Sequence, residues 1–189
     1  MYSALIVSGA EKDASLFAGI LNAASVNKIN TLNSAGEARR LLFEQDFDLV
    51  IVNPPLPDEP GEELCRYIAS KDVSQVIFVV KNENFDAVSA VCGEDGVLVI
   101  SKPVNKDIFW SALSLAKSMG NRMKRMQAEN ERLKQKIEDI RIVSRAKLIL
   151  VSGMNLSEQE AHRYIEKQAM DLRSTRRAVA DRILKKFEN

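Results

Sequence analysis

Short apolar runs alternate with amphipathic stretches over the first 118 residues. The runs are rich in Val and Ile and comprise ALIVS (4–8), DLVIVN (48–53), QVIFVV (75–80) and GVLVIS (96–101). Near-continuous apolar runs of this length are typical of strands that a parallel sheet buries on both faces. A weaker strand near KINTL (28–32) brings the expected number to five.

Between the runs, apolar residues recur every three or four positions, as in helices that pack on a sheet. These amphipathic stretches cover residues 12–25, 34–45 and 61–70. The alternation predicts an α/β domain over residues 1–118, built on a five-stranded, doubly wound parallel sheet.

A single long helix is expected from about Asn105 to Leu150, because this stretch contains no proline. Its middle, residues 119–140, carries the seam of a coiled coil in alternating steps of three and four: Met123, Met126, Asn130, Leu133, Ile137 and Ile140. Asn130 stands at an a position, where paired asparagines fix register and strand number. We expect a homodimer through this linker; the alternative is a seam that packs against the chain's own first domain.

Residues 141–189 predict a small module of three helices. The long helix is expected to end at Gly153, a residue suited to a C-cap. Ser157 and Glu160 form a capping box that opens a second helix, and Ser174 or Thr175 caps a third. The apolar stripe of the third helix is expected to be Ala178, Val179, Ile183, Leu184 and Phe187.

Charge is distributed unevenly along the chain, although its net charge is only +1. Residues 1–118 hold 10 Lys and Arg against 16 Asp and Glu, whereas residues 141–189 hold 11 against 6. A basic module beside an acidic domain favours a polyanionic partner for the module, although a solvated basic helix face is the simpler alternative.

Other features of the composition narrow the function. Cys65 and Cys92 lack CxxC spacing and are expected to be buried thiols, and His162 is the sole histidine. We therefore expect no metal, no cofactor and no catalytic residue. The first residues resemble no secretory signal and no apolar run could span a bilayer, so a cytoplasmic protein without membrane contact is expected.

Two motifs resemble the receiver domain of response regulators: VNPPLPDEPG (52–61), which looks like a strand-end acceptor with its proline-containing loop, and SKPV (101–104), which looks like the fifth-strand Lys-Pro. The resemblance extends over about residues 1–118. It implies that Ser8 and Gly9 stand where the family has its acidic metal-binding pair, and that Asn53 stands at the phosphoacceptor. Val80 and Lys81 replace the family's hydroxyl residue, so of the reactive set only Lys102 remains.

These departures predict a receiver-like domain that cannot be phosphorylated, because phosphoryl transfer depends on a metal with carboxylate ligands. Asp48 and Asp58 are interpreted as solvated surface carboxylates, and Lys102 as making an ordinary polar contact near Asn53. The domain's surface is then expected to serve dimerisation, to dock a sensor or regulatory protein, or to position the C-terminal module.

The C-terminal module resembles the ANTAR domain of bacterial antitermination regulators. RAKLIL (145–150), LSEQEAHRYIEKQAMDLR (156–173) and RRAVADRIL (176–184) carry this resemblance, in the expected order. It implies that each protomer binds a hairpin with exposed loop bases in a nascent transcript, which prevents a terminator from forming.

Cations and hydroxyls of the module are the candidates for RNA contact, because arginine can bond phosphates bidentately or stack on unpaired bases. The candidates are Arg145, Lys147, Arg163, Lys167, Arg173, Ser174, Thr175, Arg176 and Arg177. Lys185 and Lys186 are expected to complement the dipole of the last helix. His162 and Tyr164 could stack on a base, but a structural role is favoured for both.

Two other functions remain open. The module could bind duplex DNA as a helix-turn-helix, or the chain could be a protein-interaction adaptor that binds no nucleic acid. An enzyme is disfavoured, because no nucleophile with its base is visible.

Overall fold

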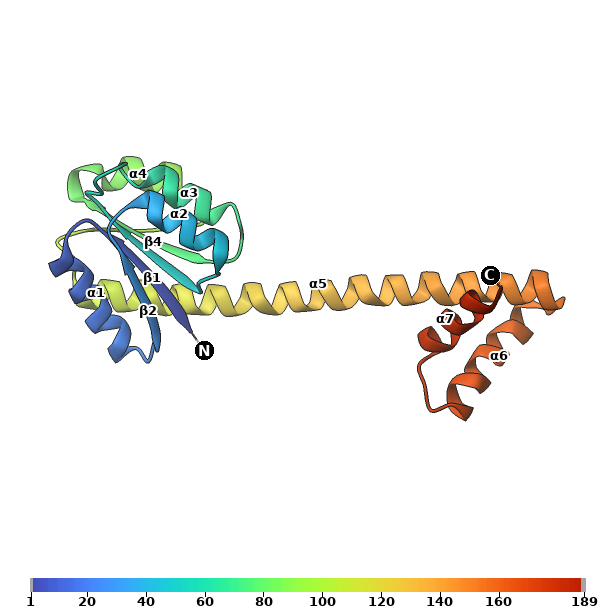
Figure 1. Cartoon of the computed structure of the whole chain (residues 1–189). Helices are drawn as coiled ribbons and strands as arrows, with labels where there is room; N and C mark the ends of the chain where they lie inside the picture. Colours follow the sequence, from blue (N-terminus) through green and yellow to red (C-terminus); the bar gives the residue numbers. More distant parts are fainter. Residues whose placement is uncertain (1, 188–189) are drawn as a thin grey trace. The chain divides into compact units, whose positions relative to one another are not determined.

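Five parallel strands form one sheet in the order β2-β1-β3-β4-β5 (Figure 1). The structure, a computed structural model, describes residues 2–187. The strands are β1 (Ser3–Ser8), β2 (Lys28–Leu32), β3 (Leu49–Asn53), β4 (Gln75–Lys81) and β5 (Leu98–Lys102). The predicted doubly wound sheet is therefore confirmed, including the weak strand at 28–32.

Helices cover both faces of this sheet. One face carries α1 (Glu11–Ala23) and the first part of α5 (Lys106–Met154). The other face carries α2 (Ala35–Glu44), α3 (Glu62–Ala69) and α4 (Phe85–Cys92) (Figure 1). This two-sided cover explains why most of the strands read as unbroken apolar runs.

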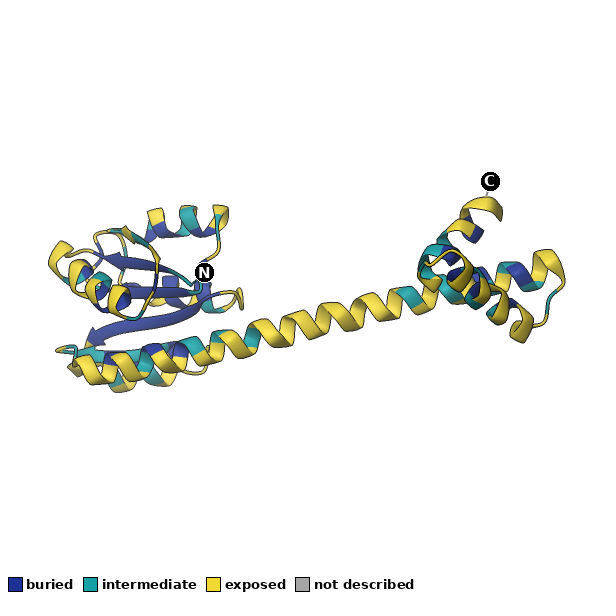
Figure 2. Ribbon diagram, turned by 90° about the horizontal axis from the view of Figure 1, so that it is seen from below, coloured by how far each residue is buried: buried dark blue, intermediate teal, exposed yellow. Residues whose placement is uncertain are grey.

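Successive strand residues supply two separate cores. Leu5 of β1 belongs to the cluster under α2, α3 and α4, whereas its neighbour Ile6 belongs to the cluster under α1 and α5. Both side chains are fully buried, because consecutive residues of a strand point to opposite faces. The residues of β1, β3 and β4 are nearly all buried, and Figure 2 shows strands of the sheet in dark blue, the colour of buried residues. The expected burial of Cys65 and Cys92, at 0% and 1% exposure, is confirmed.

Helix α4 is an element that the apolar periodicity missed. It follows a 3-10 turn, η1 (Asn82–Asn84), and has only eight residues. Only Val88 and Cys92 are buried within it, so its periodic signal is short and weak.

The chain divides into two compact units between Lys124 and Arg125, and α5 runs through this point. In the second unit, the end of α5 packs with α6 (Glu158–Asp171) and α7 (Arg176–Phe187). Nine residues form its core: Ala146, Leu150, Ala161, Ile165, Ala169, Val179, Ala180, Ile183 and Leu184. The three predicted helices are thus present, and they bury one common cluster.

The ends of these helices confirm two expectations and correct a third. Ser157 and Glu160 form the predicted capping box, and Thr175 is the cap of α7, accepting from the Ala178 N–H at 3.2 Å. The expected end at Gly153 is wrong, since α5 continues to Met154. Asn155 then takes the left-handed conformation, with φ 55°, which asparagine tolerates better than most residues.

The expected apolar stripe of α7 is partly wrong. Phe187 is 42% exposed, whereas Ala180, which was not expected in the stripe, is fully buried. Phe187 lies outside the buried cluster, with its ring 3.3 Å from where a Cβ of Gly153 in α5 would be. Among residues 2–187, no helix is long and apolar enough to cross a bilayer.

Candidate phosphorylation site and nucleic-acid interface

Residues from four strands meet at the carboxyl edge of the sheet, where a receiver domain would hold its phosphoryl group. Ser8 lies opposite Asn53 across β1 and β3, and Lys81 lies opposite Lys102 across β4 and β5. The structure therefore brings the predicted positions to one edge, as parallel strands require.

Asn53 is built into this edge by its amide hydrogens. It is 1% exposed, and its Nδ2 donates to Ser8 Oγ at 2.9 Å and to Asp13 Oδ2 at 3.1 Å. An aspartate at this position would have no hydrogen to donate and would face the Asp13 carboxylate. The site thus suits an amide, and Asn53 Oδ1 has no hydrogen-bond partner within the described chain.

Asp13 is a site residue that the sequence reading missed. It lies in the first turn of α1, forty positions from Asn53. An acidic residue just after the first strand was the available signal, but it stands a few residues beyond the place where the family has its acidic pair.

Gly9 is held in place by a close approach of the proline-containing loop. A Cβ added to Gly9 would lie 2.2 Å from the carbonyl oxygen of Pro55, well inside van der Waals contact. A carboxylate side chain at this position would therefore require the loop to move. The space beside Gly9 is thus filled by the backbone of Pro55.

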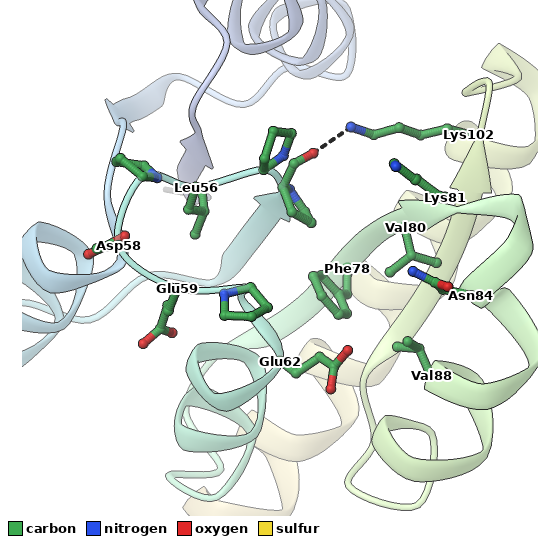
Figure 3. A pocket seen from close by; sticks show the side chains of 14 residues that line it. Leu56, Asp58, Glu59, Glu62, Phe78, Val80, Lys81, Asn84, Val88 and Lys102 are labelled. Carbon is green, nitrogen blue, oxygen red and sulfur yellow. Dashed lines mark hydrogen bonds between the residues drawn. The ribbon is translucent and has the colours of Figure 1, made fainter.

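Lys102 turns to a neutral partner, as expected. Its Nζ donates to the carbonyl oxygen of Pro54 at 2.6 Å (Figure 3). Val80 is 4% exposed and apolar, and the exposed Lys81 lies 3.5 Å from Glu83. No side-chain hydroxyl from this end of β4 is available to bond a phosphoryl group.

The interpretation of Asp48 as a solvated carboxylate is wrong. Its side chain is 10% exposed, pairs with Lys124 and accepts from the Ser3 N–H at 2.7 Å. Burial alone would raise the pKa of Asp48, but the bonds from Lys124 and Ser3 bring it below its usual value. Asp48 therefore tethers the base of β3 and is no acceptor candidate.

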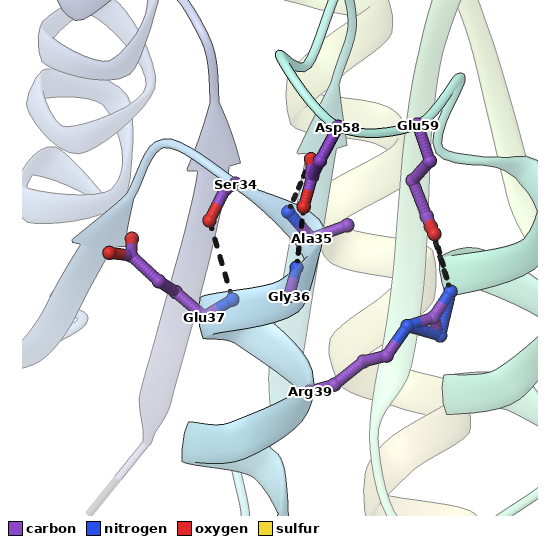
Figure 4. A network of polar contacts seen from close by, with 7 residues as sticks. All are labelled: Ser34, Ala35, Gly36, Glu37, Arg39, Asp58 and Glu59. Atoms are coloured by element: carbon purple, nitrogen blue, oxygen red, sulfur yellow. Dashed lines mark hydrogen bonds and ion pairs between the residues drawn. The ribbon is translucent and has the colours of Figure 1, made fainter.

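Asp58 is exposed, as expected, but it has a structural partner in α2 (Figure 4). Its two carboxylate oxygens accept from the N–H groups of Ala35 and Gly36 at 3.0 and 2.8 Å. These bonds, at the positive end of the helix, lower the pKa of Asp58. Asp58 thus anchors the proline-containing loop.

In the second unit, several candidate cations surround one hollow. Lys147, Thr175, Arg176 and Arg177 line a cavity of about 410 Å³ together with His162. Arg173, Ser174 and Arg176 line a neighbouring hollow of about 450 Å³. Arg145, Arg163 and Lys167 are exposed and line neither of these two hollows.

Carboxylates hold the cations of this surface in place. Arg177 lies 2.7 Å from Asp139, Arg176 lies 3.2 Å from Glu166, and Lys147 lies 2.9 Å from Glu158. The Arg177 guanidinium lowers the pKa of Asp139 by a hydrogen bond. Each guanidinium still has further donors, because one carboxylate cannot use all five N–H groups of an arginine.

The structural role in the core that was favoured for Tyr164 is wrong, because this residue is 39% exposed. Helix α6 buries the smaller Ala161, Ile165 and Ala169 instead, at steps of four, and Tyr164 lies beside this stripe. His162 is half-buried and lies 3.2 Å from Glu166.

The linker seam is largely exposed. Met126 is 64% exposed, Leu133 50%, Ile137 54% and Ile140 65%, while Met123 is half-buried. Every residue from 124 to 138, Asn130 included, is exposed.

This sheet, with its strand-end lysine and its loop anchored to α2, is that of a receiver-type signalling domain. The sequence profile of the Response regulator receiver domain matches residues 4–114, and the chain belongs to this family. The profile of the ANTAR domain matches residues 131–184, so the second unit carries that module.

Known proteins resemble the chain in part or in fold. The "Transcriptional regulatory protein PdtaR" of Mycobacterium tuberculosis is 27% identical over 137 residues, which are 72% of this chain and 67% of that protein. A two-component response regulator from Clostridium difficile, 19% identical, superposes with a TM-score of 0.53 over 62% of this chain and 97% of its own. The receiver domain of an HD domain-containing protein from Pseudomonas fluorescens Pf-5 gives 0.58 at 21% identity, over 66% and 92%. The two structures support the fold alone.

We expect Gly9→Ala to lower the thermal midpoint of the first unit, because its Cβ would meet the carbonyl oxygen of Pro55 at 2.2 Å. Overpacking of this kind costs about 1–3 kcal/mol. Gly19→Ala in α1 is the matched control, since a Cβ there meets nothing within 4 Å, and it should be neutral or stabilising. Thermal unfolding followed by circular dichroism measures both, and equal midpoints would show that the loop gives way.

Proposed function

We propose that the chain is an RNA-binding transcription antitermination regulator that acts as a dimer and whose receiver domain works without phosphorylation. The observation that carries this proposal is the succession of a receiver match at 4–114 and an ANTAR match at 131–184 in one chain. Both are regulatory modules, and no enzymatic activity is proposed.

The proposed RNA contact is the surface around the junction of α6 and α7. Arg173 there takes a left-handed conformation, with φ 46°, and Thr175 caps α7. After this left-handed residue and this cap, Arg176 and Arg177 stand at the start of α7, on the wall of the 410 Å³ hollow. A hollow of this kind, rimmed by guanidinium groups, suits a phosphate backbone with an unpaired base. The proposed ligand is a hairpin with exposed loop bases in a nascent transcript, one per protomer.

Arg176→Ala with Arg177→Ala should weaken binding to a transcript leader that carries paired hairpins ahead of a terminator. Loss of two phosphate contacts lowers the salt slope of log K by about 1.4, at about 0.7 per contact for single strands. Fluorescence anisotropy across a salt series measures this. Lys185→Ala with Lys186→Ala is the matched control, because it removes the same charge from residues that line neither hollow.

An equal loss in both double variants would mean that only net charge matters, and unchanged affinity would remove the arginines from the interface. Duplex DNA in the same assay tests the helix-turn-helix alternative, since preference for the duplex would favour it. Because Arg177 also bonds Asp139, circular dichroism must show that the variants are folded.

The proposed dimer rests on the exposed seam of α5. Met126, Leu133, Ile137 and Ile140 repeat in steps that bring them to one stripe of the helix, and all are at least half exposed. Large apolar side chains in such a stripe lose contact with water when two helices pair. Asn130 would select a two-stranded arrangement at some cost in stability.

Leu133→Ala with Ile137→Ala should convert the dimer to a monomer in sedimentation velocity experiments at micromolar concentration. Arg132→Ala with Glu138→Ala is the control, because these residues lie on the outer face of the proposed coil and the pair of changes conserves charge. A monomeric wild-type chain would contradict the dimer, as would a control variant that dissociates to the same extent.

The proposed loss of phosphorylation rests on Asn53, Gly9 and Lys102 together. Incubation with acetyl phosphate and Mg²⁺ should leave the intact mass unchanged, because an amide is no phosphoacceptor and because Ser8 and Gly9, which follow β1, supply no carboxylate to a metal. In residues 2–187, no three His, Cys, Asp or Glu side chains are grouped as metal ligands. Asn53→Asp is the informative variant: we expect no adduct there either, and a stoichiometric adduct in either protein would overturn this part of the proposal.

With phosphorylation removed, the receiver domain is proposed to act through its surface. It would dock a sensor or regulatory protein, or position the ANTAR module.

A further inference from the structure

A cavity of about 630 Å³ opens between the proline-containing loop and the beginning of α4 (Figure 3). It lies at the carboxyl ends of β4 and β5, next to the phosphorylation site of an ordinary receiver but outside the hydrogen bonds of Asn53. Its floor is apolar, made of Phe78, Val80 and Val88. Four prolines of residues 54–60 line the facing wall. This volume and lining are those of a site for a small molecule.

The loop that forms the wall is fixed without any ligand. Asp58 bonds two N–H groups of α2, as Figure 4 shows, and both oxygens of Glu59 accept from Arg39 Nη2 at 2.8 Å. At the other end of the loop, Lys102 bonds the Pro54 carbonyl. A cavity held open from both ends spares its ligand the cost of ordering the loop.

Charge is divided between the two ends of the cavity. Lys81 and Lys102 lie at the strand-end rim, and Glu62, the first residue of α3, lies at the opposite side (Figure 3). The other two acidic lining residues already have partners, Asp58 in α2 and Glu59 in Arg39. The lysine rim is therefore the part of the cavity that can take an anion.

The two lysines are weakly compensated. Lys102 forms no ion pair with any residue between 2 and 187 and donates only to a neutral carbonyl. Lys81 pairs with Glu83 at 3.5 Å, and both side chains are at least 70% exposed, so this pair contributes little. A carboxylate between the two amines would replace weak contacts with charge-assisted hydrogen bonds.

We propose that this cavity binds a small carboxylic acid with an apolar body, the carboxylate between Lys81 and Lys102 and the body over Phe78, Val80 and Val88. The substitution of Val80 for a hydroxyl residue fits this ligand, because it makes the floor apolar where a phosphoryl site would be polar. The receiver domain thus takes a chemical input in place of a phosphoryl group. This inference is independent of RNA binding.

The probe is 3-phenylpropionate, compared with 3-phenylpropanol and 3-phenylpropylamine, which share its body but are neutral and cationic. Titration of the full chain, followed by ¹H–¹⁵N correlation spectra, should give millimolar or tighter binding of the acid, as for other ligands of this size. Shifts should cluster at residues 54–60, 78–88 and 102. The alcohol and the amine should bind about tenfold more weakly or worse, because they lose the charge-assisted bonds.

Asn84→Trp should block the mouth of the cavity and abolish binding, since Asn84 is an exposed lining residue. Asn82→Trp in the same 3-10 turn is the matched control, because Asn82 is exposed but lines no part of the cavity. Lys81→Gln with Lys102→Gln should remove the preference for the acid while leaving the spectrum of a folded protein.

Three outcomes would overturn the proposal: equal binding of the three probes, shifts that map elsewhere, or no binding of the acid. The last result would also be obtained if a protein side chain or a second copy of this chain already fills the cavity, and it counts against the proposal in that case too.

Discussion

Burial of one parallel sheet on both faces is the constraint on which the receiver unit depends. Helices α1 and α5 cover one face of the sheet, and α2, α3 and α4 cover the other. Between successive strands a helix carries the chain back to the amino edge of the sheet, so that all five strands run parallel and end at the carboxyl edge. Every strand-to-helix loop therefore meets at the carboxyl edge. Asn53, Lys102 and the proline-containing loop are neighbours for this reason, whatever chemistry they retain.

At that edge the polar side chains and the proline-containing loop are engaged by contacts within the chain. The Asn53 amide bonds Ser8 and Asp13, the Pro55 carbonyl approaches Gly9, and Lys102 bonds the Pro54 carbonyl. The loop that makes two of these contacts also forms one wall of the 630 Å³ cavity.

The ANTAR unit follows a different principle, since its small core leaves most of its polar side chains at the surface. Three of its candidate cations, Lys147, Arg176 and Arg177, are paired with Glu158, Glu166 and Asp139. An RNA ligand would meet arginines already oriented by these carboxylates, with N–H donors left to offer. Such pairing reduces binding to any polyanion and favours one that fits the hollow.

The sequence by itself determined the order of the elements, the five strands, the capping box at Ser157 and the substitution of Asn53, because periodicity, caps and motif positions are local properties of the chain. It missed the short α4, whose periodic signal spans only two turns. Only the tertiary structure decided that Asp13 reaches Asn53 across forty positions, that Gly9 leaves room for Pro55, that the Asp48 side chain is only 10% exposed and that Tyr164 is exposed. These depend on which distant segments the sheet and the small helical core bring together, and no local pattern records such distances.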